Sequence, residues 1–131
     1  MLKPILTVFA FGIVSFAVQG LSHFVINVEH FASIDFLRKE PVIPLGLTAM
    51  IVQALIFSFV MAKLFPMGAS LSQCLAVVAS FGIFLGIYIA LAEPAKYAAP
   101  SIPAWIMFEA TASTLQFLLF SIPLWLIYRK P

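Results

Sequence analysis

Four long apolar stretches, separated by short polar links, form the main pattern of this chain. They cover approximately residues 5–29, 44–65, 70–92 and 102–128. A bilayer core about 30 Å thick is crossed by about 20 apolar residues of helix, so each stretch is long enough to cross once. Because short links place consecutive helices side by side in opposite directions, the pattern predicts an all-α integral membrane four-helix bundle. Its predicted course is antiparallel, up-down-up-down, in a single transmembrane domain over residues 1–131.

Prolines mark several of the predicted helix ends. Pro44 and Pro103 stand in first turns, where a missing N–H leaves no helical hydrogen bond unmade, and Pro66 and Pro94 follow the second and third stretches. The first stretch resembles a signal peptide in its apolar run. We interpret it as a retained span because residues 17–19, Ala-Val-Gln, make a poor cleavage site.

Composition supports the membrane interpretation. Of the 131 residues, 63% are hydrophobic and 9% are charged, whereas soluble domains are about half apolar and about a quarter charged. A soluble domain of this size leaves too much surface exposed to hide so many apolar residues. The net charge of +2 is too small to indicate a nucleic-acid partner. The expected partners are the lipid bilayer and other membrane protein subunits.

The distribution of charge predicts the orientation in the membrane. With four spans, both termini lie on one side, together with the basic residues Lys3, Lys63, Arg129 and Lys130 and no acidic residue. The opposite side carries Arg38, Lys39, Lys96, Asp35, Glu40 and Glu93. Because basic residues favour the cytoplasmic side, we expect both termini to be cytoplasmic, in a bacterial-type inner (plasma) membrane.

A stripe of polar residues interrupts the far end of the first stretch. Its members, spaced by four, four and three, are Gln19, His23, Asn27 and His30. This spacing places them on one helix face, and His23 lies about 27 Å along the helix from Ile5. Gln53 in the second span and Glu109 in the fourth fall at comparable depths. We therefore expect the stripe to face the bundle interior and meet Glu109. The candidate ligand-binding residues are Gln19, His23, Asn27, His30, Gln53 and Glu109.

Glu109 is the residue that most needs an explanation. Insertion scales assign about 2.5–3.5 kcal/mol to a charge at the centre of a membrane helix, and an intramembrane carboxyl is by default a functional hypothesis. We therefore expect Glu109 to be protonated or paired, and His23 matches it best in depth. The alternative is a structural hydrogen bond between helices.

The sequence contains few residues arranged to bind a metal ion or a cofactor. His23 and His30, about 10.5 Å apart on one helix, cannot bind opposite faces of one haem, and no recognised metal-ligand spacing occurs. A metal would need one of them together with Glu109, Glu29 or Glu93. The single cysteine, Cys74, is interpreted as a small buried hydrophobe. No catalytic motif is present, and no cofactor can be named.

Small residues in the last two spans indicate how these helices pack. Gly82, Gly86 and Ala90 recur every four residues in the third span, and Ala110 and Ser113 lie in the fourth. Small residues allow close helix approach in membranes, so we expect the two spans to dock here. Aromatic rings near the ends of the last span are expected to act as interfacial anchors: Tyr97, Trp105, Trp125 and Tyr128.

Three functional hypotheses follow, and the first is favoured. The protein is a non-catalytic accessory or assembly subunit of a larger membrane complex, because it has little mass outside the membrane. Alternatively, it binds or transports a small ligand, such as a lipid, quinone or pigment, through the polar cluster in the outer half. The third hypothesis is a membrane enzyme in which His23 and Glu109 form an acid–base pair.

Overall fold

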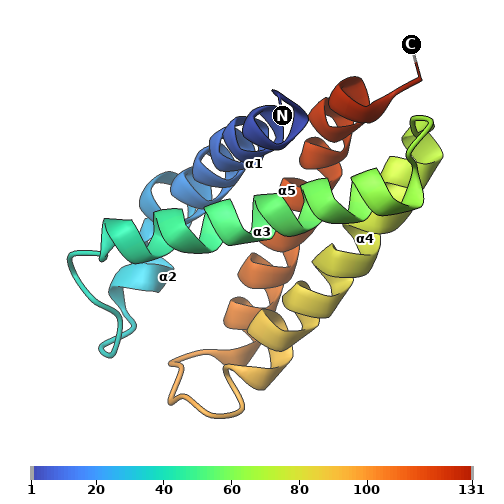
Figure 1. The fold of residues 1–131 in the computed structure, drawn as a ribbon. Helices are drawn as coiled ribbons and strands as arrows, with labels where there is room; N and C mark the ends of the chain where they lie inside the picture. The colour runs from blue at the N-terminus through green and yellow to red at the C-terminus, as the bar shows by residue number, and fades with distance from the viewer. Residues whose placement is uncertain (1, 131) are drawn as a thin grey trace.

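A computed structural model describes residues 2–130 of the chain (Figure 1). In order, the helical segments are α1 (Leu2–Leu21), the π-helical turn η1 (Ser22–Ile26), α2 (Val28–Ala32), α3 (Ile43–Leu64), α4 (Leu71–Ile87), the π-helical turn η2 (Tyr88–Ala92) and α5 (Ile102–Tyr128). Within residues 2–130 no strand forms, and the only bridge is isolated, between Ala69 and Arg129. The prediction of an all-α four-helix bundle is confirmed.

Four segments are long and apolar enough to cross a bilayer: Leu2–Ile26, Ile43–Leu64, Leu71–Ala92 and Ile102–Tyr128. The last coincides with the predicted span at both ends, and every other boundary lies within three residues of its prediction. Large aliphatic and aromatic side chains are exposed along all four segments, as expected where lipid is the solvent. The chain is a small polytopic membrane protein.

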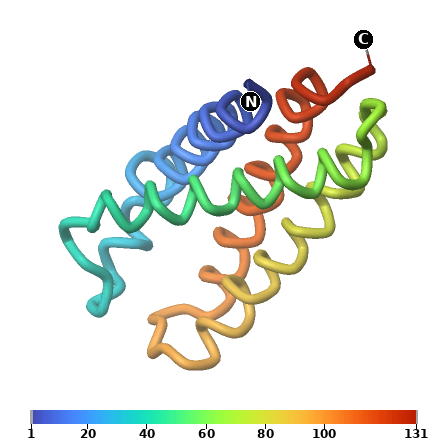
Figure 2. The backbone as a smooth tube through the Cα atoms, viewed as in Figure 1, coloured from blue at the N-terminus to red at the C-terminus, as the bar shows by residue number. Residues whose placement is uncertain are grey.

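Helix α5 is the common neighbour that α1 and α4 share, while α3 packs mainly against α1 (Figure 1, Figure 2). The centre of the core is a group of phenylalanine rings. Phe11 of α1 lies 4.9 Å from Phe120 of α5 and 5.7 Å from Phe57 of α3, measured between ring centroids. Phe57 also lies 5.2 Å from Phe81 of α4. These rings connect all four spanning helices.

The chain termini and the α3–α4 turn meet at one end of the bundle (Figure 1). There the Ala69 N–H donates to the Tyr128 carbonyl at 2.8 Å. The Tyr128 hydroxyl lies 2.6 Å from Ser58 Oγ and 3.5 Å from Thr7 Oγ1. At the opposite end, Phe36 of the α2–α3 loop packs against Tyr97 of the η2–α5 loop, with 5.3 Å between ring centroids. These contacts hold the helix ends together at the two ends of the bundle.

The prediction of interfacial anchors is wrong for two aromatic residues. Tyr128 is only 3% exposed, and its hydroxyl is used in the contacts just described. Trp105 is only 4% exposed, and its indole N–H donates to the Ile89 carbonyl of η2 at 3.0 Å. Both rings have a polar group that can be satisfied inside the bundle, so they bury their apolar surface there instead of at the membrane boundary.

Helices α4 and α5 approach closely where α4 carries glycine. A Cβ on Gly82 would lie 2.8 Å from Phe117 Cγ, and one on Gly86 would lie 3.5 Å from Ser113 Cβ. Ala90 is buried in η2. Ala110 is exposed instead of packed between the helices, so the contact uses Ser113 and Phe117 of α5 and not Ala110.

Candidate functional site

The first span is not one regular helix. The α-helical pattern ends at Leu21, η1 follows, and Asn27 has backbone angles of φ −112° and ψ 26° before α2 begins. The Asn27 N–H donates to the Ser22 carbonyl at 2.9 Å, and its side-chain amide donates to Ser22 Oγ at 3.1 Å. The helix is therefore interrupted at Asn27, near the far end of the span expected over residues 5–29.

This interruption changes what surrounds His23. Residues eight apart in a continuous helix are separated by about 12 Å along its axis, yet the rings of His23 and Phe31 are stacked, 3.8 Å between centroids and 18° between planes. Helix α2 therefore turns back far enough for Phe31 to cover the imidazole. This covering leaves 30% of the His23 side chain exposed.

A chain of polar side chains runs between α1 and α5 in the half of the bundle away from the termini. Gln19 Nε2 donates to Gln116 Oε1 at 2.7 Å, and Gln116 Nε2 donates to Ser15 Oγ at 3.0 Å. Farther along, His23 of η1 and Glu109 of α5 face each other, with their Nε2 and Oε1 atoms 3.7 Å apart. We call these five residues, Ser15, Gln19, His23, Glu109 and Gln116, the polar seam.

The tautomer of His23 follows from its backbone contact. His23 Nδ1 lies 3.0 Å from the Gln19 carbonyl oxygen, and a carbonyl can only accept, so Nδ1 carries a hydrogen. A neutral His23 then presents the lone pair of Nε2 toward Glu109. A single proton on the two groups gives either imidazole with carboxylic acid or imidazolium with carboxylate. Both arrangements are neutral overall, which fits a pair whose carboxyl side chain is 9% exposed.

The structure brings together three of the six candidate ligand-binding residues, Gln19, His23 and Glu109. Asn27 is turned to Ser22 at the helix break. His30, on α2, packs its ring against Phe108, 4.8 Å between centroids, and its Nε2 has no hydrogen-bond partner within residues 2–130. Gln53 is half-buried and takes part in none of the side-chain hydrogen bonds of the seam.

Two members of the seam, Ser15 and Gln116, were not among the predicted site residues. Ser15 precedes Gln19 by four positions, and Gln116 follows Glu109 by seven, so each extends a polar helix face. The spacing was a usable signal. A second polar cluster, Thr7, Ser58 and Tyr128, was also missed because its members are isolated polar residues on three different helices.

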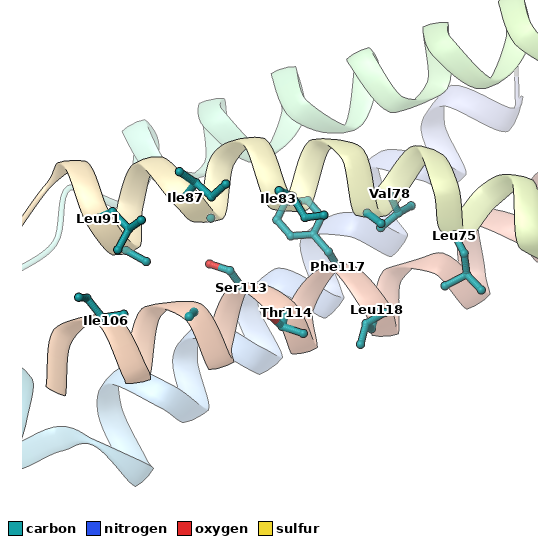
Figure 3. A pocket seen from close by; sticks show the side chains of 15 residues that line it. Leu75, Val78, Ile83, Ile87, Leu91, Ile106, Ser113, Thr114, Phe117 and Leu118 are labelled. Carbon is teal, nitrogen blue, oxygen red and sulfur yellow. The ribbon is translucent and has the colours of Figure 1, made fainter. Parts of the chain in front are cut away.

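Two apolar grooves lie on either side of α5. One, of about 440 Å³, lies between α4 and α5 (Figure 3). The other, of about 410 Å³, lies between α1 and α5. Neither groove is lined by His23 or Glu109. Residues 2–130 contain no group of three or more His, Cys, Asp or Glu side chains placed to hold a metal ion.

Two charged residues, Glu93 and Lys96, lie in the loop directly after the third span. Lys96 Nζ donates to the Tyr88 hydroxyl at 2.9 Å, and this hydrogen bond raises the pKa of Lys96. Partial burial raises the pKa of the Glu93 carboxyl, and the Lys96 ammonium acts in the opposite direction. The loop therefore places Glu93 and Lys96 directly after the end of the third span.

Comparison with known proteins adds no assignment: the chain matches no protein-family model, no curated protein sequence and no solved structure.

Proposed function

We propose that this protein is a non-catalytic accessory or assembly subunit of a larger membrane complex. The observation that carries the proposal is the separation of its polar groups from its open surface. The Gln19–Gln116–Ser15 hydrogen bonds and the His23–Glu109 pair lie between α1 and α5, whereas the outward-facing grooves are apolar. Ligand and substrate sites typically combine a cavity with convergent polar groups. Mainly apolar grooves that no charged side chain lines are better suited to contacts with other membrane helices.

The size of the native particle tests this proposal. The chain is tagged in its own host and extracted from the membrane with a mild detergent, and the mass of the particle is measured. We expect a particle much larger than the 14.4 kDa chain that contains other membrane proteins. A monodisperse particle of this chain alone would contradict the proposal.

The proposed orientation places both termini in the cytoplasm, as part of a bacterial-type inner membrane. The basic side chains Lys3 and Lys63 and the pair Arg129 and Lys130 support it through the positive-inside rule. With Cys74 replaced by alanine, a cysteine introduced at Lys130 is expected to react with an impermeant thiol reagent only after the cells are opened. A cysteine introduced at Ala98 is expected to react in intact cells, and the reverse pattern would overturn the orientation.

A second candidate function is the binding of a small ligand with a hydrogen-bonding head group. The specific observation is the 3.7 Å gap between His23 Nε2 and Glu109 Oε1, which is longer than a hydrogen bond. A ligand hydroxyl or carbonyl group that reached the pair could bond to both residues. Purified protein should then carry a lipid, quinone or pigment that the Glu109→Gln variant loses. Identical bound material in both proteins would reject this function.

A further inference from the structure

The α4–α5 groove contains two hydroxyl groups, of Ser113 and Thr114, that make no side-chain hydrogen bond in the part of the chain that the structure describes. This groove is lined by side chains from residues 75–91 of one wall and 106–118 of the other (Figure 3). Ser113 is 5% exposed and lines the groove, and Figure 3 shows its oxygen directed into the space between the two helices. Neither Ser113 nor the neighbouring Thr114 takes part in a side-chain hydrogen bond within residues 2–130.

Three hydroxyls on the spanning helices form local hydrogen bonds that Ser113 and Thr114 lack. Thr7, Ser80 and Ser121 each donate to a backbone carbonyl three or four residues earlier, at 2.8, 2.8 and 2.6 Å. That local bond is the usual way to satisfy a hydroxyl in an apolar helix. A hydroxyl left unpaired in such surroundings is unfavourable, so the groove floor is suited to an occupant that supplies hydrogen-bonding groups.

Depth restricts what that occupant can be. Ser113 and Thr114 lie close to the middle of α5, which runs from Ile102 to Tyr128. Phospholipid head groups stay at the membrane surface, about 15 Å from the midplane of the hydrocarbon core. Of a phospholipid, only the acyl chains reach the level of these hydroxyls, and acyl chains offer no hydrogen bond. A protein helix can bring a polar group to this depth.

The walls of the groove also favour a helix. Ala79, Gly86 and Ala110 line it, and small residues of this kind allow a helix backbone to approach closely, as in many membrane helix pairs. A Cβ on Gly86 would meet only Ser113, at ordinary contact distance. The groove, of about 440 Å³, therefore has space beside its small residues for another helix, and its polar groups are the hydroxyls of Ser113 and Thr114.

We propose that the α4–α5 groove docks a transmembrane helix of another protein, one that places a hydrogen-bonding group at the level of Ser113 and Thr114. The proposal rests on the accessory-subunit function and specifies the surface through which that function is exercised. Its partner is defined by chemistry: an apolar spanning helix with a polar side chain, or a closely approached backbone carbonyl, near its middle.

Cross-linking in the native membrane identifies the occupant. A benzophenone-bearing residue replaces Thr114 in one variant and Phe84 in a matched control. Phe84 lies on α4, is 80% exposed and does not line the groove. We expect position 114 to link to a spanning segment of a different protein that contains a mid-helix polar residue, and position 84 to link to lipid. Adducts at position 114 with lipid, or with a second copy of this chain, would overturn the proposal.

Removal of the hydroxyls tests their part in docking. Ser113→Ala should lower the ratio of assembled to free chain about three-fold, and Ser113→Ala with Thr114→Val about eight-fold, because polar contacts between membrane helices are individually weak. Thr111→Val, in the groove on the other side of α5, should leave the ratio unchanged. The thermal stability of the purified chain should be equal in all of these variants. An unchanged ratio in the double variant would overturn the proposal.

Failure of the docking proposal is distinguishable from failure of the accessory function. A large native particle combined with lipid adducts at position 114 rejects the docking surface and retains the function. A native particle of this chain alone rejects both.

Discussion

At the scale of single residues, the backbone carbonyl of Gln19 determines how His23 meets Glu109. This carbonyl holds the hydrogen of Nδ1, so that Nε2 is the imidazole atom that faces the carboxyl at 3.7 Å. The depth of both residues could be predicted from the sequence by counting along each helix. Their separation and the tautomer could not, because both depend on the bend at Asn27 and on the rotation of α5.

Substitution of Glu109 should separate charge from hydrogen bonding. Glu109→Gln keeps the shape and supplies an N–H that can donate to His23 Nε2, so the free energy of unfolding should change little. Glu109→Leu leaves Nε2 unpaired in the membrane and should lower the free energy of unfolding by about 1–3 kcal/mol. Unfolding in mixed micelles measures both, with the exposed Glu29, as Glu29→Leu, for the control. Equal destabilisation by Gln and Leu would contradict the hydrogen-bonding role.

At the scale of elements, the sequence predicts the long helices better than their interruptions. Mean hydropathy over about 20 residues identifies a span because the bilayer imposes that length, and this explains the agreement for α5. The break at Asn27 has no such constraint: no proline or glycine marks it. The even spacing of Gln19, His23, Asn27 and His30 predicted one face, but the π-helical turn and the bend turn Asn27 and His30 away from the seam.

The two glycines at the α4–α5 contact should respond differently to substitution by alanine. Gly82→Ala places a methyl group 2.8 Å from Phe117 Cγ, and overpacking of this kind lowers the free energy of unfolding by about 1–3 kcal/mol. Gly86→Ala meets Ser113 at 3.5 Å, an ordinary contact, so the purified chain should be unaffected or slightly more stable. Thermal unfolding of the two variants checks this, and equal stabilities would show that the helices are further apart.

At the scale of the whole molecule, the ends of the bundle are held by contacts that hydropathy does not predict. Tyr128 joins α5 to α3 through Ser58, and the α3–α4 turn reaches the chain end through Ala69. The turn depends on Gly68, whose φ is +94°. The number of spans follows from composition, whereas the position of α5 between α1 and α4 follows from side-chain packing that no single sequence pattern shows.

Substitution of Gly68 tests this end of the bundle. Gly68→Ala adds a Cβ 2.8 Å from the backbone of Lys130 and forces an L-residue into a left-handed conformation, which alone is unfavourable by about 1–2 kcal/mol. Gly46→Ala, in α3 with nothing within 4 Å of its Cβ, should be neutral or stabilising by up to about 1 kcal/mol. Unfolding of both variants in the same micelles gives the comparison, and a Gly68→Ala protein as stable as Gly46→Ala would contradict the packed turn.

The most direct test of the account is to observe the His23–Glu109 pair in a bilayer. Solid-state NMR on the His30→Gln variant, with ¹⁵N-labelled histidine and ¹³C-labelled glutamate, isolates the signals of His23. We predict a hydrogen on Nδ1 and a measurable dipolar coupling between Nε2 and the Glu109 carboxyl carbon. A His23 ring that shows no coupling to that carbon, and whose nitrogens exchange freely with water, would contradict it.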